Sequence, residues 1–304
     1  YRALALRNIE DTDVLEAHIG VVEGRSLQPG GKHSAVVMGG GFIGLEFAEN
    51  LQQRGWQTTI VELADQIMGP LDPELAEVFQ NHLEANGVRV LTNVSVTEIT
   101  SSRVKLSDGT ELAAELVLAS IGVRPETHLA GDAGLEGAES GGIVVDEYQR
   151  TSDPAIFAVG DAAVKRDAID GSPIMIPLAN PANRHGRLVA DVIAGRDVTS
   201  LPNLATAIVS VFGMQAAETG WNEKRARAAG RNIRVIHTHP LDHADYYPGA
   251  KAMSLKLVVD ADTDEIIGAQ GVGEAGVDKR IDVIATAMRG GLRASQLADL
   301  ELSY

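Results

Sequence analysis

Residues 35–63 read AVVMGGGFIGLEFAENLQQRGWQTTIVEL, and the chain is organised around this stretch. A short apolar run precedes the glycine pattern GGGFIG at 39–44, which opens an amphipathic segment that closes at Gly55. A second run of β-branched residues then ends at Glu62. Strand, glycine turn, helix and second strand in this order are typical of a dinucleotide-binding unit. The sequence therefore predicts an α/β fold with a Rossmann-like domain here.

Each glycine of the pattern has a separate role. Gly39 permits the tight turn after the strand, Gly41 lets a pyrophosphate approach the backbone, and Gly44 lets the helix pack closely on the strand. Phe42 and Ile43 occupy the positions between the last two glycines. The N–H groups and the positive dipole end of the helix then face the diphosphate. The pattern thus predicts a phosphate-binding turn.

The residue that follows the second strand indicates which dinucleotide binds. Glu62 lies 18 residues after Gly44, where a carboxylate accepts hydrogen bonds from both hydroxyls of the adenosine ribose. A phosphorylated ribose would require Arg or Lys just after the strand, and Leu63, Ala64 and Asp65 stand there instead. The sequence therefore favours NAD(H) over NADP(H), and NADP(H) remains the open alternative.

Composition restricts the classes of partner. The 304 residues include 26 basic and 42 acidic side chains, for a net charge of −16, and no Lys/Arg cluster stands out. Nucleic acid and anionic membrane surfaces are therefore not expected as partners. There is no cysteine, so these residues provide no disulfide, thiolate metal site or thiol nucleophile. No apolar run approaches the roughly 20 residues of a membrane helix, and no signal peptide is visible, so a cytoplasmic location is expected.

The first nucleotide-binding unit is expected to extend over residues 34–125, after a lead-in of mixed character at 1–33. Asp72 followed by Pro73 predicts a second helix, with Asp72 as its N-cap. Short apolar stretches and an Asp-Gly turn then predict a β-meander that returns to the sheet. Gly122 follows the last strand, where a strand should meet the cofactor.

Residues 126–199 form the next region. They begin as a glycine-rich loop and continue through predicted strands at 143–145 and 156–159. The second of these strands ends at Gly160-Asp161, and a helix is predicted to begin at Asn180-Pro181.

Residues 200–304 predict an α+β region, because strand-like runs precede a long amphipathic helix. One face of that helix carries Ile281, Ile284 and Met288, which must be buried somewhere.

Two motifs in this last region resemble binding sites but lack the necessary context. The run 271–276 repeats the glycine fingerprint, yet no second strand ending in an acid follows it, so a strand-to-helix turn is predicted. His237, His239 and His243 have a spacing that zinc could use. In a cysteine-free polar loop, we expect no metal there.

Five motifs occur in the order of a known protein family. They are the fingerprint with Glu62, IGVRP at 121–125, TSDPAIFAVGDAA at 151–163, IPLANPANRHGRLVADVIAG at 176–195 and VDKRIDVIATAM at 277–288. With them the chain resembles the FAD-dependent pyridine nucleotide-disulfide oxidoreductases. Within that family the resemblance is to the coenzyme A-disulfide reductase and NADH oxidase/peroxidase branch, and it covers nearly the whole chain.

The resemblance implies an order of domains. Residues 1–33 would be a lead-in from the FAD domain, 34–125 the NAD-binding domain, 126–199 the second part of the FAD-binding domain, and 200–304 an α+β dimerisation domain. In that family, the FAD fingerprint and the redox cysteine lie in an N-terminal segment that precedes the part resembling this chain. We therefore expect the chain to be truncated and inactive alone. The sequence leaves open whether this chain retains FAD and whether a rhodanese-like domain follows it.

The resemblance also assigns contacts to the flavin. Asp161 would hydrogen-bond the ribityl chain, and Gly160 would allow its close approach. Leu178 and Ala179 would lie beside the isoalloxazine ring. A carboxylate at the carboxyl end of a strand is well placed for ribose-like hydroxyls, which agrees with the role of Asp161.

Further residues are assigned around the nicotinamide and the acceptor. By resemblance, Phe42 covers the flavin face, Glu46 is an acid near that face, and Gly122 is the second nicotinamide contact. Tyr246 and Tyr304 match tyrosines that reach the partner subunit's disulfide site in the coenzyme A-disulfide reductases, with the residue after Tyr246 as a competing choice.

The implied reaction of the intact protein passes a hydride from NADH to FAD, and then reduces a cysteine-based acceptor such as coenzyme A disulfide, a persulfide or a polysulfide. Reduction of oxygen or peroxide is the alternative within the family. A non-catalytic NAD-binding module is the alternative outside enzymes. A homodimer formed through residues 200–304 is expected.

Overall fold

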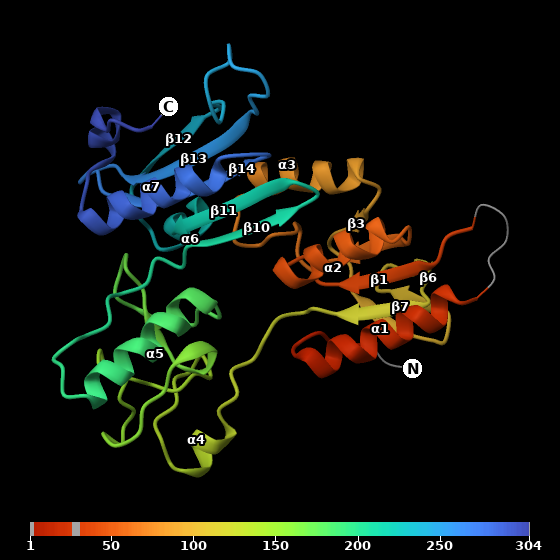
Figure 1. Ribbon diagram of the computed structural model, residues 1–304, viewed down its shortest axis with the longest axis horizontal. Coiled ribbons are helices and arrows are strands. Elements are labelled where there is room, and N and C mark those ends of the chain that lie inside the picture. Colours follow the sequence, from red (N-terminus) through yellow and green to blue (C-terminus); the bar gives the residue numbers. More distant parts are fainter. Residues whose placement is uncertain (1–2, 26–30, 304) are drawn as a thin grey trace.

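The computed structural model describes residues 3–25 and 31–303. Three parts can be distinguished, which we call the first (3–122), second (126–203) and third (204–303). Figure 1 shows the parallel sheet of the first part on the right, the sheet of the third part at the upper left, and the second part around α5 at the lower left.

A parallel sheet forms the centre of the first part, with strand order β3-β2-β1-β7. The strands are β1 (Ser34–Met38), β2 (Gln57–Val61), β3 (Arg89–Leu91) and β7 (Leu116–Ala119). Successive side chains of a strand point to opposite faces. Accordingly Ala35 and Val37 join one buried cluster, and Val36 joins another.

Each face of this sheet is covered by a different layer. The helices α1 (Ile9–Glu23), α2 (Phe42–Gln53) and α3 (Pro73–Ala85) bury their apolar sides in the cluster that contains Val37. The antiparallel strands β4 (Val96–Ile99), β5 (Arg103–Leu106) and β6 (Glu111–Ala113) pack on the face of Val36. The predicted strand–helix–strand unit, second helix and meander are all present.

Two details of the first part differ from expectation. Leu15, Ile19 and Val22 of α1 lie in the core of the parallel sheet, and Leu4 N donates to Val117 O at 2.8 Å. The expected lead-in therefore packs as part of the nucleotide-binding unit. The helix α3 begins after Asp72 as predicted, but the Asp72 side chain makes no capping bond to α3.

The second part contains little regular structure. Its elements are α4 (His128–Asp132), η1 (Gly160–Ala162), β8 (Lys165–Arg166), β9 (Pro173–Ile174) and α5 (Ala179–Ile193). The strands predicted at 143–145 and 156–159 are reduced to isolated bridges at Ile143 and Phe157. The helix α5 has Leu178 as its N-cap, so it starts before the predicted Asn180-Pro181. A proline in the first turn is compatible with this start, because the N–H that it lacks has no partner within the helix.

The third part is a five-stranded antiparallel sheet in the order β10-β11-β14-β13-β12. Its elements are β10 (Ala207–Val211), β11 (Met214–Gly220), α6 (Glu223–Ala228), β12 (Ile233–Thr238), β13 (Met253–Asp260), β14 (Ile266–Gly273), α7 (Val277–Gly290) and η2 (Ala294–Asp299). Ile281 of α7 is buried against this sheet, and Ile284 packs beside it. The apolar face of the predicted helix is thus covered by its own sheet.

The first and third parts share one hydrophobic core. Val209 and Val211 of β10 and Val272 of β14 lie in the same buried cluster as Phe79 and Leu83 of α3. The two parts therefore pack as one body. No helix within residues 3–25 and 31–303 is long and apolar enough to cross a membrane.

Candidate functional site

Three strand ends meet at the carboxyl edge of the parallel sheet. β1 runs into the glycine turn, β2 ends before Glu62, and β7 ends before Ser120. The strand order places β1 between the other two, so their carboxyl ends lie side by side. Gly39 N donates to Val61 O at 2.9 Å, and Ser120 N donates to Met38 O at 2.8 Å. These bonds fix the turn between its neighbours.

The three glycines of the fingerprint have different surroundings. Gly39 has φ +103°, and a Cβ there would lie 2.4 Å from the carbonyl oxygen of Ser120. A Cβ on Gly44 would lie 2.1 Å from the carbonyl oxygen of Gly39, so helix and turn are in close contact. A Cβ on Gly41 would meet no atom within 4 Å. Gly39 and Gly44 are thus required by packing, whereas Gly41 faces the open space that a pyrophosphate needs.

The surroundings of Gly41 fit a bound dinucleotide. Gly41 is the N-cap of α2, and no side chain in the described part of the chain caps that helix. Its first N–H groups are therefore available to an anion. The Glu62 carboxylate accepts from Gly40 N at 2.7 Å and from Ala64 N at 2.8 Å, which holds it beside the turn. Donors for a diphosphate and an acceptor for ribose hydroxyls stand next to each other.

The other residues assigned to the nicotinamide side lie along the same edge. Phe42 is half-buried and packs on the core, while Ile43 and Glu46 of the first turns of α2 are exposed. Gly122 lies just past β7 with φ +101° and open space around its Cα. The structure brings all these residues together around the glycine turn.

Sequence reasoning missed Ser120. Its Oγ donates to Met38 O at 2.8 Å and to Gly39 O at 3.3 Å, so this side chain ties the end of β7 to the turn. The available signal was a hydroxyl residue two positions before Gly122.

The residues assigned to the flavin lie in the second part. Gly160 has φ +76° and open space where a Cβ would be, and Asp161 is exposed beside it in η1. Leu178 and Ala179 begin α5, which packs against η1. An open glycine, an exposed carboxylate and a helix start therefore converge, and this arrangement fits a bound flavin nucleotide.

Lys165 supports this turn and was also missed. Its side chain is buried, and Nζ donates to the carbonyl oxygens of Gly160 and Ala163, the latter at 2.8 Å. Burial lowers the pKa of Lys165, and the Asp161 carboxylate opposes that shift. The lysine thus holds the backbone that presents Asp161.

A cavity of about 250 Å³ adjoins Lys165 and is also lined by His185 and Gln149. Burial lowers the pKa of His185, and the positive charges of Lys165 and Arg184 lower it further. The imidazole is therefore neutral at pH 7 and adds no positive charge beside Lys165.

Tyr246 is not brought to the nucleotide edge within one chain. Tyr246 is 79% exposed in the loop between β12 and β13, and Tyr247 is 66% exposed beside it. Figure 1 shows this loop projecting at the top of the view, apart from the parallel sheet. Tyr304 lies outside the described residues.

The second glycine fingerprint leaves no room for a ligand. A Cβ on Gly271 would lie 2.8 Å from the Leu255 side chain, and one on Gly273 would lie 2.6 Å from Met253 Cβ. Beside Gly271 and Gly273, side chains of the third part fill the space, whereas the corresponding space beside Gly41 in the first fingerprint is open. The run 271–276 is the predicted strand-to-helix turn.

The three histidines have separate partners. His237 Nε2 lies 3.1 Å from a Glu74 oxygen, His239 Nδ1 lies 3.2 Å from Ser254 Oγ, and His243 Nδ1 lies 2.9 Å from an Asp242 oxygen. In the described residues these rings do not converge on one point.

Comparisons with known proteins agree with this geometry. A family model described as pyridine nucleotide-disulphide oxidoreductase matches residues 3–186, and the model of that family's dimerisation domain matches residues 206–303. The chain belongs to this family. The family depends on FAD and NAD(P). The predicted fold class, with a Rossmann-like NAD-binding domain, part of an FAD-binding domain and an α+β dimerisation domain, is confirmed.

Two curated relatives align with almost the whole chain. A coenzyme A disulfide reductase from Staphylococcus aureus (strain bovine RF122 / ET3-1) is 28% identical over 300 residues, which cover 98% of this chain and 66% of the relative. An NADH oxidase from Methanocaldococcus jannaschii is 31% identical over 303 residues, which cover 98% and 65%. The chain therefore spans just under two thirds of these relatives.

Two solved structures superpose closely. Reduced CoADR-RHD from Bacillus anthracis has a TM-score of 0.95 at 40% identity, covering 100% of this chain and 54% of that one. An NAD-dependent persulfide reductase from A. fulgidus has a TM-score of 0.94 at 37% identity, covering 99% and 55%.

Proposed function

We propose that the protein containing these residues is an FAD-dependent NADH:disulfide oxidoreductase. Its acceptor would be a coenzyme A disulfide, a persulfide or a polysulfide. The observation that carries the proposal is the open glycine turn at Gly41 beside the Glu62 carboxylate, at the carboxyl edge of a parallel sheet. The similarity to CoADR-RHD and to a persulfide reductase, at 40% and 37% identity, supports the sulfur acceptor.

The first part of the chain binds NADH in this proposal. The N–H groups at the start of α2 hold the diphosphate, and Gly41 leaves room for it. Glu62 accepts hydrogen bonds from the adenosine ribose, which favours NADH over NADPH because a 2′-phosphate would meet a carboxylate. Gly122 and Glu46 would border the nicotinamide, and Phe42 would cover the flavin face.

The second part of the chain holds the flavin. FAD, when bound, supplies the two-electron chemistry that links NADH to the sulfur acceptor. Asp161 binds the ribityl hydroxyls, and Gly160 lets the flavin approach the backbone. Leu178 and Ala179 would lie beside the ring. The 304 residues contain no cysteine, so a thiolate that attacks a disulfide must come from outside them.

The third part forms a homodimer in this proposal, as the match to the family's dimerisation domain supports. The exposed Tyr246 is then free to approach a neighbouring subunit, and Tyr304 remains the second proposed tyrosine. A phenol at that site can donate a proton to a departing thiolate.

A second function is favoured by one comparison. The M. jannaschii relative, at 31% identity, is an NADH oxidase, so electrons could pass to oxygen or peroxide instead of sulfur. The same NADH and flavin residues would serve both reactions. The two functions differ only in the acceptor.

The acceptor is tested on the full-length protein that contains these residues. NADH oxidation is measured with coenzyme A disulfide as acceptor, together with thiol release and oxygen uptake. Reduction of a disulfide by NADH and a proton yields two thiols and NAD⁺, so thiol release should be about twice the NADH consumed. Oxygen uptake that accounts for all the NADH, without thiol release, would instead establish the oxidase.

A further inference from the structure

The loop between Glu62 and α3, residues 63–72, forms one wall of the nucleotide edge. Met68 N donates to the carbonyl oxygen of Gly40 at 2.8 Å. Ile67 packs on Gly40 so closely that a Cβ there would lie 2.5 Å from Ile67 Cγ2. Both Ile67 and Met68 are buried. A shift of this loop therefore moves the glycine turn and the carboxylate next to it.

The third part of the chain holds this loop from its outer side. Asn222 Nδ2 donates to Pro70 O at 2.9 Å. Lys224 Nζ donates to Gly69 O and to Gln66 Oε1, both at 3.2 Å. The loop has no helix or strand of its own, so these contacts from α6 and its N-cap fix backbone that would otherwise be bound to water.

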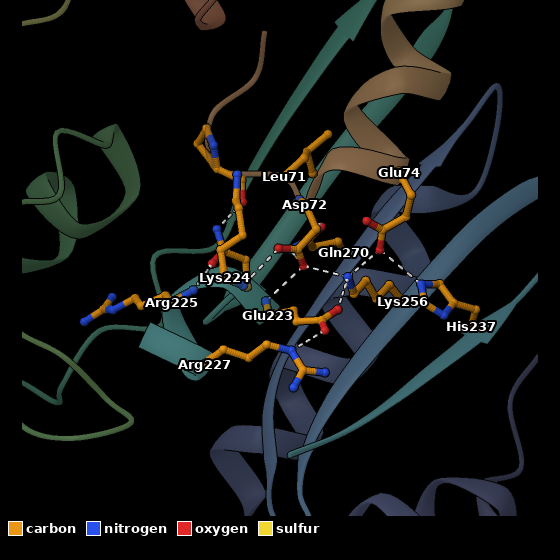
Figure 2. Close-up of polar contacts among 12 residues, drawn as sticks. Leu71, Asp72, Glu74, Glu223, Lys224, Arg225, Arg227, His237, Lys256 and Gln270 are labelled. Atoms are coloured by element: carbon orange, nitrogen blue, oxygen red, sulfur yellow. Dashed lines mark hydrogen bonds and ion pairs between the residues drawn. The ribbon is translucent and has the colours of Figure 1, made fainter. Parts of the chain in front are cut away.

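Asp72, at the end of the loop, is bound to the third part rather than to its own helix (Figure 2). Its buried carboxylate accepts from the N–H groups of Glu223 at 2.9 Å and Lys224 at 3.1 Å, which open α6. It also accepts from Gln270 Nε2 at 2.9 Å, and Asp72 N donates back to Gln270 Oε1 at 2.8 Å. The residue predicted to cap α3 therefore contributes to the cap of α6.

Lys256 of β13 supplies the positive charge at this point (Figure 2). Its side chain is 1% exposed, and Nζ lies 3.0 Å from Asp72, 2.7 Å from Glu223 and in contact with Glu74. Burial opposes its charge, but the three carboxylates outweigh burial and raise the pKa of Lys256. Burial likewise opposes ionisation of Glu74, yet Lys256 and His237 help to lower the pKa of Glu74 to about 2.

Without Lys256 the cluster would be unbalanced. Oxygens of Asp72, Glu74 and Glu223 lie within 4.8 Å of one another, a set that could hold a metal ion if the ammonium were not among them. Like charges at that separation repel, most strongly at the buried Asp72. Lys256 thus balances the carboxylates through which the loop and α3 are tied to β13.

We propose that this joint, made of Asp72, Glu74, Glu223 and Lys256, is the positioning device through which the third part of the chain sets the affinity of the nucleotide edge. The inference rests on the proposed binding of NADH at Glu62 and the glycine turn. The joint acts through loop 63–72, and a displacement of the third part is transmitted to that edge by the same contacts.

The test compares, in the full 304-residue chain, one substitution in the joint, one at the contact between Lys224 and loop 63–72, and one control. Lys256→Met removes the buried charge. Lys224→Met removes the exposed ammonium that binds the loop carbonyl, and this variant is expected to fold. Lys251→Met is the matched control, because Lys251 forms a surface ion pair with Glu274 in the same part. For each variant, circular dichroism records the unfolding temperature. Calorimetry then measures the dissociation constant for NADH well below that temperature.

We expect Lys224→Met and folded Lys256→Met to weaken NADH binding roughly fivefold or more, with Lys251→Met unchanged. A merely structural joint would lower the unfolding temperature and leave the NADH affinity of the folded chain unaltered, and that result would overturn the inference. An unmutated chain that fails to bind NADH would remove the proposed function, and this inference with it.

Discussion

Gly39 and Gly41 have different roles although they belong to one turn. Gly39 has φ +103° and no room for a side chain, whereas Gly41 has φ −88° and open space. We predict that Gly41→Ala changes the free energy of unfolding by less than about 0.5 kcal/mol. The new methyl group takes the space of the pyrophosphate, so NADH binding weakens roughly tenfold or more.

Gly39→Ala is the matched comparison and should lower the free energy of unfolding by about 1–3 kcal/mol because of backbone strain. Urea denaturation and calorimetry with NADH measure the two effects. A Gly41→Ala chain that binds NADH as tightly as the unmutated chain would contradict the role assigned to Gly41.

Glu62 is predicted to determine which nucleotide binds. A 2′-phosphate opposite this carboxylate should make NADPH bind roughly tenfold more weakly than NADH, a difference of about 1.4 kcal/mol. Glu62→Arg should reverse the order, because a guanidinium pairs with phosphate. Calorimetry with both nucleotides on both chains provides the measurement. Equal affinities for NADH and NADPH in the unmutated chain would rule out this account of Glu62.

The residues that could be predicted from sequence are those with a fixed spacing. The fingerprint and Glu62 lie within one strand–helix–strand unit, so local pattern sufficed to place them together. Ser120 and Lys165 could not be found in this way. Ser120 binds Met38, 82 positions earlier, and Lys165 acts through backbone carbonyls that carry no sequence signal.

Among the secondary elements, those with strong periodicity or clear caps were predicted in place. The helices α3 and α7 are examples. The strands predicted at 143–145 and 156–159 were wrong, because an apolar run forms a strand only where a neighbour pairs along it. In the described part of the chain, that pairing is limited to isolated bridges. Asp72 preceded its helix as predicted, but tertiary contacts gave its side chain another partner.

Glu218 of β11 makes stability depend on pH. Burial, and then the neighbouring Asp72 charge, raise the pKa of Glu218 from 4.5 to about 7. The folded chain therefore holds this proton while the unfolded chain releases it, so the contribution to stability falls as pH rises from about 4.5 to about 7. Above that window the loss is constant, at most about 3 kcal/mol.

Glu218→Gln should remove this dependence. At pH 8 the variant should be more stable than the unmutated chain, and the difference should vanish near pH 4.5. Glu139→Gln, at an exposed position, is the control. Thermal unfolding across this pH range gives the measurement, and a pH-independent difference between Glu218→Gln and the unmutated chain would show the assignment to be wrong.

At the scale of the whole molecule, the order of the three parts could be predicted from motifs, but their packing could not. The core shared by α3 and β10 joins residues more than a hundred positions apart. The periodicity of apolar residues along the sequence does not indicate such a contact. The apolar face of α7 is buried within its own part. That face therefore gives no argument for a subunit interface, and the expectation of a dimer depends on the match to the dimerisation domain.

We predict a homodimer with contacts in residues 206–303. Sedimentation at several concentrations should show reversible dimers, and hydrogen exchange at high and low concentration should differ mainly in that range. The intact chain is used because removal of the third part would expose the shared core. A monomer at every concentration, or protection confined to residues 34–119, would contradict the prediction.

The central claim, that the glycine turn at 39–44 is the nucleotide site, is tested most directly by hydrogen exchange with and without NADH. The first N–H groups of α2 lack a capping side chain in the described chain, so they should exchange fast alone and slowly when a diphosphate accepts from them. Protection at Phe42, Ile43 and Gly44 on addition of NADH is the predicted result. No protection there, or protection centred on the second fingerprint at 271–276, would contradict it.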